Sequence, residues 1–467
     1  MSKRRVRSSF LVFLMLSSVL IALVGPASPV MANNETTSGT ITTSETWSGT
    51  HQLTGDITIA SGAKLIIQPG TTVIFPNGTY LDVRGNLCAG SSSCGSSGDA
   101  SLANKITFRW TDPSNASEIG ECKGMKQGTQ EIQVEDASCF EGVLIRSSID
   151  LSETGFRHIT IDDAWGIPYY IDSINRWRYG AMVIDGASPT LTQMRFSNIN
   201  TSSVLTTNLA QPIFEGGTYV AGNDGKSGVG GSAVQIYGSG TQITPLKMNS
   251  PFFIGTDNGC GNNDGGRPTL WAQETFIEIN DATVNTGDYG FAFVSSSGLL
   301  TNSDINVNCN GIDINGVKAI QGVAYTFEVG NNEINTDEGS GITVYDGGDA
   351  ELHNNQISGV ADRSGITVQS SKAHIHNNEI GPIGGWNGLW LTGSFDVIAE
   401  YNTIIDTAKT PVQVGELSTS GPAPAASRLH FTNNTVSVNS PGICSSFKYW
   451  GGEYTCPAVS VFRSGVT

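Results

Sequence analysis

Positive charge is scarce in this sequence of 467 residues, in which 25 Lys and Arg stand against 42 Asp and Glu. Four of the basic residues precede Ser8, so without residues 1–32 the balance becomes 21 against 42, a net charge of −21. Nucleic acids and anionic lipid surfaces both need a basic patch on a protein partner. The composition therefore disfavours both as partners and is typical of an acidic protein outside the cell.

Long apolar runs are missing after the first segment. Residues 10–24 form a run of 15 apolar and small residues after a basic start, which is short of the about 20 residues that span a bilayer. Pro26 and Pro29 follow, and Val30-Met31-Ala32 supplies the small side chains of a signal-peptidase site. We expect residues 1–32 to be a cleaved signal peptide. The mature chain is then extracellular, secreted or at the cell surface, without membrane insertion after cleavage.

Cysteine spacing typical of zinc is missing too, because none of the eight Cys residues forms a C-x2-C pair. An even number of Cys in an exported chain predicts disulfides, although eight Cys allow 105 connectivities. We favour sequential pairing, since three of the resulting pairs close short loops. The expected pairs are Cys88–Cys94, Cys122–Cys139, Cys260–Cys309 and Cys444–Cys456.

An internal repeat is present, without the helical stretch or the L-x-x-L-x-L pattern of leucine-rich repeats. Asn331-Asn332-Glu333-Ile334 recurs from Asn354 and from Asn377, each time after 23 residues, and from Tyr401 after 24. A fifth copy begins at Asn433. A period in the low twenties that contains several short strands predicts an all-β solenoid, a β-helix whose coils lie about 4.8 Å apart.

A second repeated phrase lies between these copies. Gly341-Ile342-Thr343-Val344 matches Gly365-Ile366-Thr367-Val368, and both alternate apolar with polar residues as half-buried strands do. The phrases predict one inner wall of Ile342, Ile366, Leu389 and Val412 and another of Leu352, Ile375 and Phe431. The second Asn of each copy should occupy a turn, where Asn tolerates the left-handed conformation and stacked amides can bond along the axis. These structural residues are Asn332, Asn355, Asn378, Asn402 and Asn434.

The repeats and the row of asparagines resemble the pectin-lyase-like superfamily of right-handed parallel β-helices. The stretch from Trp47 through Pro69-Gly70 to Lys105-Ile106-Thr107-Phe108 resembles the opening coils of bacterial and archaeal secreted surface proteins of that group. The resemblance implies a single-stranded right-handed parallel β-helix with loop insertions, which we place at 111–140, 201–231 and 244–272.

The expected organisation is a solenoid preceded by a short polar linker. It comprises the signal peptide 1–32, a linker at 33–46, N-terminal coils at 47–110, irregular coils with insertions at 111–299 and regular coils at 300–467.

Enzymes of this family supply motifs that the sequence matches only in part. Asn335-Thr336-Asp337 resembles the first phrase of polygalacturonases, but no Asp-Asp, Gly-His-Gly or Arg-Ile-Lys follows it. Pectate lyases need clustered Asp for calcium and a basic residue, for which Asp162 and Asp163 with Arg176 and Arg178 are the nearest candidates. Catalytic residues therefore stay unassigned. A polysaccharide lyase or glycoside hydrolase acting on an extracellular polysaccharide is the alternative function.

Two groups of residues could hold metal ions. His353 and His376 share a repeat position and Glu400 follows one coil later, so their side chains should form an outward ladder. Repetition alone produces such a ladder, and we predict no metal there. Asp257-Asn258 and Asn262-Asn263-Asp264 carry oxygen atoms that calcium accepts, although Asn-Gly runs are common in turns. No cofactor is expected, and calcium is the one ion left open.

Aromatic residues make up only 8% of the chain, yet one segment concentrates them with arginine. Flat rings stack on sugars and Arg bonds to hydroxyls or carboxylates, although such rings can equally pack an irregular coil. The segment predicts a glycan-binding site in a stalk, adhesin or glycan-binding module whose partner is an extracellular or envelope polysaccharide. Its predicted residues are Trp165, Tyr169, Tyr170, Trp177, Tyr179, Arg176 and Arg178.

Overall fold

The computed structural model of the protein describes ten stretches of the chain. They are residues 36–110, 140–222, 231–256, 260, 267–320, 323–360, 363–407, 410–415, 427–437 and 459–461. The predicted signal peptide and the segments that contain Cys122, Cys139, Cys444 and Cys456 lie outside these stretches. Among the described residues, no helix has the length and hydropathy needed to cross a bilayer.

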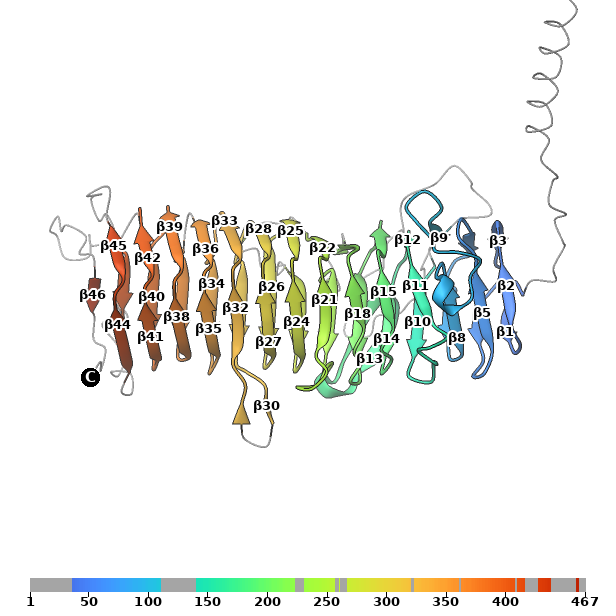
Figure 1. Ribbon diagram of the computed structural model, residues 1–467, viewed down its shortest axis with the longest axis horizontal. Coiled ribbons are helices and arrows are strands. Elements are labelled where there is room, and N and C mark those ends of the chain that lie inside the picture. The colour runs from blue at the N-terminus through green and yellow to red at the C-terminus, as the bar shows by residue number, and fades with distance from the viewer. Residues whose placement is uncertain are drawn as a thin grey trace, which may run out of the picture. The chain divides into compact units, whose positions relative to one another are not determined.

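The chain from Thr36 onward winds into coils, each of which adds one strand to each of three parallel sheets. Figure 1 shows the strands stacked in chain order from β1 at the blue end to β46 at the red end. The three sheets, here called A, B and C in the order in which each coil visits them, enclose one continuous apolar core.

Sheet A has fifteen strands in its continuous path, and β13 (Ile167–Ile171) pairs with β14 at its side. The path is β1 (Gly39–Ile41), β4 (Ile57–Ile59), β7 (Tyr80–Val83), β10 (Gly142–Arg146), β14 (Arg176–Asp185), β17 (Ser202–Thr207), β20 (Val234–Tyr237), β23 (Pro268–Gln273), β26 (Tyr289–Val294), β29 (Ile312–Asn315), β34 (Ile342–Tyr345), β37 (Ile366–Gln369), β40 (Leu389–Thr392), β43 (Val412–Val414) and β46 (Val459–Val461).

Sheet B has 14 strands. They are β2 (Glu45–Trp47), β5 (Lys64–Ile67), β8 (Asn86–Ala89), β11 (Gly155–Arg157), β15 (Thr190–Thr192), β18 (Ile213–Glu215), β21 (Leu246–Asn249), β24 (Phe276–Asn280), β27 (Ser297–Thr301), β32 (Phe327–Gly330), β35 (Asp349–His353), β38 (Lys372–His376), β41 (Asp396–Glu400) and β44 (Arg428–Thr432).

Sheet C also has 14 strands. They are β3 (Thr50–Gln52), β6 (Thr72–Phe75), β9 (Ile106–Trp110), β12 (Ile159–Asp162), β16 (Arg195–Ser197), β19 (Thr218–Val220), β22 (Phe252–Ile254), β25 (Thr283–Thr286), β28 (Asp304–Val307), β33 (Glu333–Thr336), β36 (Gln356–Gly359), β39 (Glu379–Ile383), β42 (Thr403–Ile405) and β45 (Thr435–Ser437).

Short elements decorate the turns between these strands. A two-stranded antiparallel hairpin of β30 (Ala319–Ile320) and β31 (Val323–Ala324) projects between sheets A and B (Figure 1). The described helical residues form two 3-10 turns, η1 (Ser92–Cys94) and η2 (Asp172–Ile174). The fold is therefore all-β, as predicted.

The alternating phrases build the inner walls in the predicted register. Ile342 pairs with Ile366, which pairs with Leu389 and then Val412, and all four side chains are buried. The other predicted wall is also present, since Leu352 pairs with Ile375 and the column continues through Ala399 to Phe431. Stacking one apolar residue on the next in every coil removes their surfaces from water, which is the main stabilisation of a solenoid.

The glycine that opens the phrase is required by close packing between sheets C and A. A Cβ at Gly365 would lie 2.5 Å from a methyl group of Ile380 and 2.9 Å from the carbonyl oxygen of Gly388. The equivalent Gly341 and Gly388 meet the same obstacle from Ile357 and Ile404. A side chain at this corner would push the wall of sheet C outward.

The asparagine ladder is confirmed as a continuous chain of buried amides. Asn355 Nδ2 donates to Asn378 Oδ1 at 3.0 Å, and Asn378 Nδ2 donates to Asn402 Oδ1 at 2.9 Å. Each Oδ1 also accepts a hydrogen bond from the backbone N–H of the previous Asn. Each Nδ2 also donates to a carbonyl one coil back, such as that of Leu352 for Asn378. The ladder therefore satisfies backbone groups that the turn between sheets B and C would otherwise leave buried and unpaired.

The left-handed conformation belongs to the residue before each ladder Asn, which corrects one expectation. Asn331, Asn354, Asn377, Tyr401 and Asn433 have φ between 53° and 58°. Asn is favoured there because its short polar side chain tolerates this region. The ladder position instead requires a side-chain amide that donates through Nδ2 and accepts through Oδ1. This is why it stays Asn in the copy that begins with Tyr401.

The beginning of the solenoid lies earlier than expected. Gly39–Ile41 lies inside the predicted linker at 33–46 and pairs with β4, and Glu45–Trp47 begins inside that linker and pairs with β5. Ile41 and Trp47 are buried in the core, so one inward residue per short strand is enough to add a coil. The insertions expected at 201–231 and 244–272 likewise contain coil strands, among them β17, β19 and β22.

The disulfide prediction is confirmed for the two pairs that the structure describes. Cys88 bonds to Cys94 and Cys260 to Cys309, which are the sequential partners. The first closes a loop after β8, and the second ties the segment after β22 to the turn after β28.

The register of sheet A can be tested with a pair of charge substitutions. Ile366→Asp places an unpaired carboxylate in the core and should lower the free energy of unfolding by more than about 3 kcal/mol. Gln369→Asp, on an exposed position of the same strand, should change it by less than about 0.5 kcal/mol. Urea unfolding followed by circular dichroism measures both, and equal losses would contradict the register. Thr367 is a poor control, since it faces outward but is only 6% exposed.

The ladder can be tested at neighbouring asparagines. Asn378→Ala should cost more than about 2 kcal/mol, because Asn355 loses its acceptor and the Leu352 carbonyl loses its donor inside the protein. Asn377→Gly changes an exposed residue whose φ of 55° suits glycine and should be nearly neutral. Thermal unfolding of the two variants compares them, and a neutral Asn378→Ala would show that the ladder is dispensable.

Candidate functional site

A hairpin interrupts the solenoid at the aromatic segment singled out from the sequence. The strand β14 is ten residues long, and only its second part follows the ladder of sheet A. Its first part pairs antiparallel with β13, from Ile167 opposite Gly180 to Ile171 opposite Arg176. The turn η2 and Asn175, in the left-handed conformation with φ 51°, reverse the chain.

The hairpin is held by a second apolar cluster outside the solenoid. Ile167 and Ile171 pack with Leu144, Val183 and Leu205, which face outward from three successive strands of sheet A. An apolar patch on an outer face is normally exposed to water, and here β13 covers it. The hairpin is therefore a fixed part of the outer face of sheet A.

Two of the seven predicted binding residues are packing residues. Trp165 is 3% exposed and belongs to the interior core, and Tyr179 is 6% exposed, with a pKa raised by burial. Trp165 precedes the hairpin, and Tyr179 lies opposite Pro168 within it. A glycan on the surface cannot stack on either buried ring, so neither is a binding residue.

Two other rings are exposed at the tip of the hairpin. Trp177 is 56% exposed and Tyr170 39%, and their rings meet edge to face at 5.3 Å. The Tyr170 hydroxyl donates to Asn175 Oδ1, which fixes its ring beside the turn. Arg176 is exposed next to them, and Tyr169 is half-buried against the apolar cluster.

Arg178 is positioned by a chain of hydrogen bonds that crosses the coils. Its Nε donates to the Tyr237 hydroxyl at 2.7 Å, and its guanidinium lies 5.6 Å from the centre of that ring. The Tyr237 hydroxyl donates to Gln235 Oε1, and Gln235 Nε2 donates to Ser202 Oγ. The network joins the hairpin to the next strands of sheet A.

Positive charge concentrates at this place in an acidic protein. Desolvation and then the like charge of Arg178 lower the pKa of Arg267, and Arg176 adds to this effect. Within the described part of the chain, no carboxylate forms an ion pair with Arg176 or Arg178. Guanidinium groups without a carboxylate partner are available to bind anions.

A second polar group lies farther along the same face. Asp313 occupies the outward position between Ile312 and Ile314, and Asn310 Nδ2 donates to its carboxylate at 3.1 Å. Burial raises the pKa of Asp313 to about 6, and the Asn310 hydrogen bond opposes that shift. Burial followed by the negative charge of Asp313 raises the pKa of both Tyr289 and Tyr345.

A third group, of two Trp residues and an Arg, lies on the regular coils farther along the solenoid. The rings of Trp386 and Trp390 lie 6.0 Å apart, and the guanidinium of Arg363 lies 5.5 Å from the centre of the Trp386 ring. Trp390 occupies the same outward column as Asp313, three strands farther along, with Thr343 and Thr367 between them. Eight strand steps separate β14 from β40 in sheet A, or roughly 38 Å.

Asp313 is the site residue that the sequence analysis does not predict, whereas Trp390 is recognisable from the sequence as an outward ring beside Trp386. The phrase Gly311-Ile312-Asp313-Ile314 has the same alternation of apolar and polar residues as the later copies. The outward position reads Asp, Thr, Thr, Trp and Gln in the five copies. Variation at an outward position of a regular repeat was the available signal.

The residues compared with lyase motifs do not come together. Asp162 ends β12 in sheet C, where Ser197 and Asn198 donate to it at 2.6 and 3.0 Å. Burial and then the charge of Asp162 raise the pKa of Asp163 to about 6, and Arg109 supplies the opposing positive charge. Arg176 and Arg178 belong to the hairpin on sheet A instead.

The remaining predicted groups have separate outcomes. His353, His376 and Glu400 do lie in one column, on the outer face of sheet B. The segments with Asp257-Asn258 and Asn262-Asn263-Asp264 lie outside the described residues, so calcium stays a prediction.

Comparison with known proteins agrees with the fold. Residues 306–453 match the family described as right handed beta helix region. Together with the three parallel sheets, this match confirms the predicted right-handed parallel β-helix. No curated protein matches the sequence.

Several solved structures are similar to the chain at low sequence identity. A variant of the periplasmic alginate epimerase AlgG is 11% identical, with 83% of this chain and 78% of that one covered and a TM-score of 0.45. The Azotobacter vinelandii mannuronan C-5 epimerase AlgE6 A-module is 10% identical over 92% and 91%, with a TM-score of 0.34. The Streptococcus pneumoniae surface protein and adhesin PfbA is 12% identical over 92% and 92%, with a TM-score of 0.25. Such distant likeness carries no information about activity.

The acidity of Asp313 gives a pH-dependent test. With a folded-state pKa of about 6, above that of the unfolded chain, the folded protein binds this proton more tightly. The resulting stability is fully present below about pH 4 and is lost as the pH rises through 6. Relative to Asp313→Asn, the wild-type melting temperature should therefore fall between pH 4 and pH 7. Asp337→Asn, at an exposed turn, serves as the control, and parallel profiles for wild type and Asp313→Asn would contradict the shift.

Proposed function

We propose that the protein is a secreted or cell-surface β-helix that binds polysaccharide along the outer face of sheet A. The observation that carries the proposal is the row of solvent-accessible rings and arginines along this face. The row begins with the exposed Tyr170 and Trp177 and the half-buried Arg178. It ends with the half-buried Trp390 and with the exposed Trp386 at the corner before β40. This is the stalk, adhesin or glycan-binding role, with a defined binding face.

The chemistry of the row suits a sugar polymer. Exposed Trp and Tyr present flat apolar faces with polar edges, which suits stacking on sugar rings. Arg178 is held at a fixed place by Tyr237, so little side-chain entropy is lost when it binds a carboxylate or hydroxyl. Without residues 1–32 the chain has a net charge of −21 and repels an acidic glycan elsewhere, which favours this arginine-bearing face as the point of contact.

The geometry suits an extended ligand. The groups follow one another along the solenoid axis, since they occupy strands β14, β20, β29 and β40 of one sheet. Several weak contacts to one polymer chain reinforce each other through effective concentration. The predicted signal peptide and the two disulfides support a place outside the cytoplasm, where such polymers occur.

One observation favours the enzymatic alternative, a polysaccharide lyase or glycoside hydrolase. Asp313 has a pKa of about 6 and lies near Tyr289 and Tyr345 on the proposed binding face. A carboxyl with such a pKa can accept or donate a proton near neutral pH. We keep binding as the primary function, because no second acid or base partner is in hydrogen-bond contact with Asp313 among the described residues.

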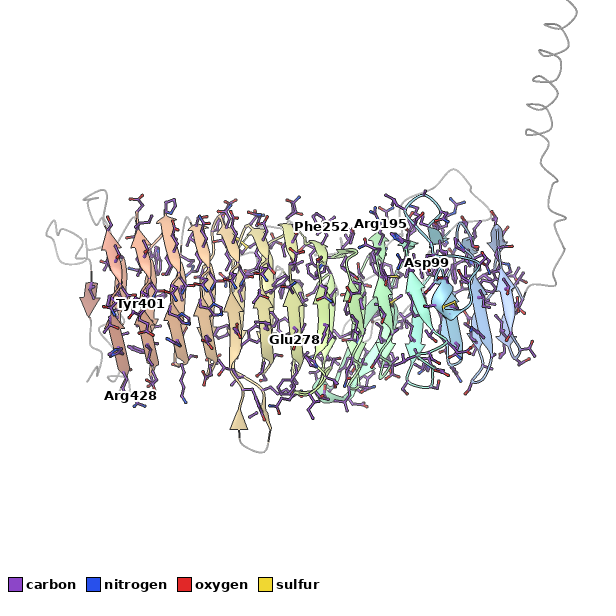
Figure 2. The ribbon with its side chains drawn as sticks, viewed as in Figure 1. Asp99, Arg195, Phe252, Glu278, Tyr401 and Arg428 are labelled. Carbon is purple, nitrogen blue, oxygen red and sulfur yellow. A yellow bond between two sulfur atoms is a disulfide. The ribbon has the colours of Figure 1, made fainter. Side chains whose placement is uncertain are left out.

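Binding can be tested by removing the exposed rings at the hairpin tip. Tyr170→Ala with Trp177→Ala should weaken retention on the bound polysaccharide by about 1–3 kcal/mol, or roughly 5–150-fold. The melting temperature should stay nearly constant, because both rings are exposed. Tyr401→Asn is the matched control: Tyr401 is 57% exposed at the corner between sheets B and C (labelled in Figure 2), and other copies carry Asn there. An array of acidic and neutral polysaccharides identifies the ligand. Equal loss of retention in the double variant and in Tyr401→Asn would contradict the proposed binding face.

The same panel separates binding from catalysis. Mature protein is incubated with each polysaccharide, with and without calcium, and unsaturated products and new reducing ends are followed. Turnover that disappears in Asp313→Asn would establish the enzymatic alternative. Retention without turnover would leave the binding function standing alone.

A further inference from the structure

The outer face of sheet B carries a compact group of imidazoles and carboxylates. Glu351 of β35 lies directly opposite His374 of β38, and His353 lies opposite His376. On sheet B this group stands between Glu278 of β24 and Arg428 of β44, both labelled in Figure 2. Three of the six His residues of the chain gather here.

Three of these side chains converge on one point. Nε2 of His376 lies 3.3 Å from Oε1 of Glu351, and the rings of His374 and His376 are 4.4 Å apart. Ligand-capable atoms of Glu351, His374 and His376 all lie within 4.8 Å of one another. Their side chains are 44%, 39% and 20% exposed, so an ion can reach them from solvent.

We propose that Glu351, His374 and His376 form a binding site for a divalent transition-metal ion of the zinc class. Two imidazoles and one carboxylate are a ligand set that Zn²⁺ binds, with water in the fourth position. Imidazole ligands favour Zn²⁺, Cu²⁺ and Ni²⁺ over Ca²⁺ and Mg²⁺. Tetrahedral ligand atoms lie about 3.3 Å apart. The Glu351–His376 pair already has this spacing, and a ring nitrogen of His374 lies within 4.8 Å of both.

The surroundings support this assignment. Nε2 of His374 lies 3.1 Å from Oε1 of Glu400, the carboxylate–histidine contact that commonly orients metal-bound rings. The amide of Asn377 contacts Nδ1 of His376 at 2.9 Å. When the amide oxygen faces that nitrogen, it accepts a hydrogen bond from Nδ1–H, and the Nε2 lone pair is left for the ion. The ligands stand on two paired strands, which fixes their spacing.

The site is independent of the proposed function, because it lies on sheet B and the binding face lies on sheet A. It also goes beyond repetition. His353 continues the column but forms its own contact with Glu328 at 3.0 Å, and Ile398 interrupts the column that contains Glu351 and His374. The convergence of three ligands is thus confined to adjacent coils.

The test uses the mature chain without an affinity tag, titrated with ZnSO₄ in a calorimeter and in thermal unfolding. We expect the calorimeter to show one ion per chain, and we expect the melting temperature to rise with the concentration of free Zn²⁺. His374→Ala, His376→Ala and Glu351→Gln should each weaken binding at least about 10–100-fold, the loss that even outer partners of a metal cause. His430→Ala and Glu328→Gln, on the same face but outside the trio, should bind as wild type does.

Substitution with Co²⁺ gives a second readout, since four-coordinate Co²⁺ absorbs visible light much more strongly than hydrated Co²⁺. Melting in EDTA shows whether each variant folds, and Glu351→Gln keeps the test valid if a His variant does not. Equal Zn²⁺ affinity in wild type and the three ligand variants would overturn the proposal. So would displacement of Zn²⁺ by equimolar Mg²⁺, which would indicate diffuse attraction to an acidic surface.

Discussion

The hydrogen bonding of each coil to its neighbours governs the architecture. Backbone groups of a parallel strand find their partners only in the coils before and after it, so a turn that leaves the ladder must supply others. The amides of Asn332 to Asn434 do this at the corner between sheets B and C. Because the register stays constant there from coil to coil, every side chain has an equivalent neighbour one strand away. The inner walls and the outer columns both follow from that constancy.

On the outside of the solenoid, the constant register gives each sheet its own set of outward side chains. Outward residues of sheet A carry rings, arginines and Asp313, whereas sheet B carries the group of His374, His376 and their carboxylate partners. Sites appear where neighbouring copies depart from the polar consensus, as Trp390 does after Thr343 and Thr367. The hairpin of β13 and β14 is a larger departure, and it needs its own apolar cluster with Leu144 and Leu205 to stay in place.

Prediction from the sequence succeeded in the repeats, because the position of one residue there also gives the position of its equivalent in every other coil. The walls of Ile342 and Leu352 and the asparagine ladder were predicted in register because a period of 23 residues leaves few alternatives. It failed at Gly39–Ile41, since a short strand with one buried residue reads like a polar linker. Trp165 and Trp177 could not be told apart either, because no repeat sets the register of a hairpin. Asp313 was missed because its own phrase does not show that adjacent coils place Tyr289 and Tyr345 beside it.

The constant strand spacing has a consequence for how such a protein can change over generations. Each group on sheet A is built from neighbouring coils, so gain of one whole coil between β23 and β26 would leave both flanking groups intact. The distance between them would change by one increment of about 4.8 Å. The distance between the groups therefore changes only in whole steps of one coil, and it can change without any substitution in either group. A family of such chains could be matched to polymers of different repeat length by counting coils alone.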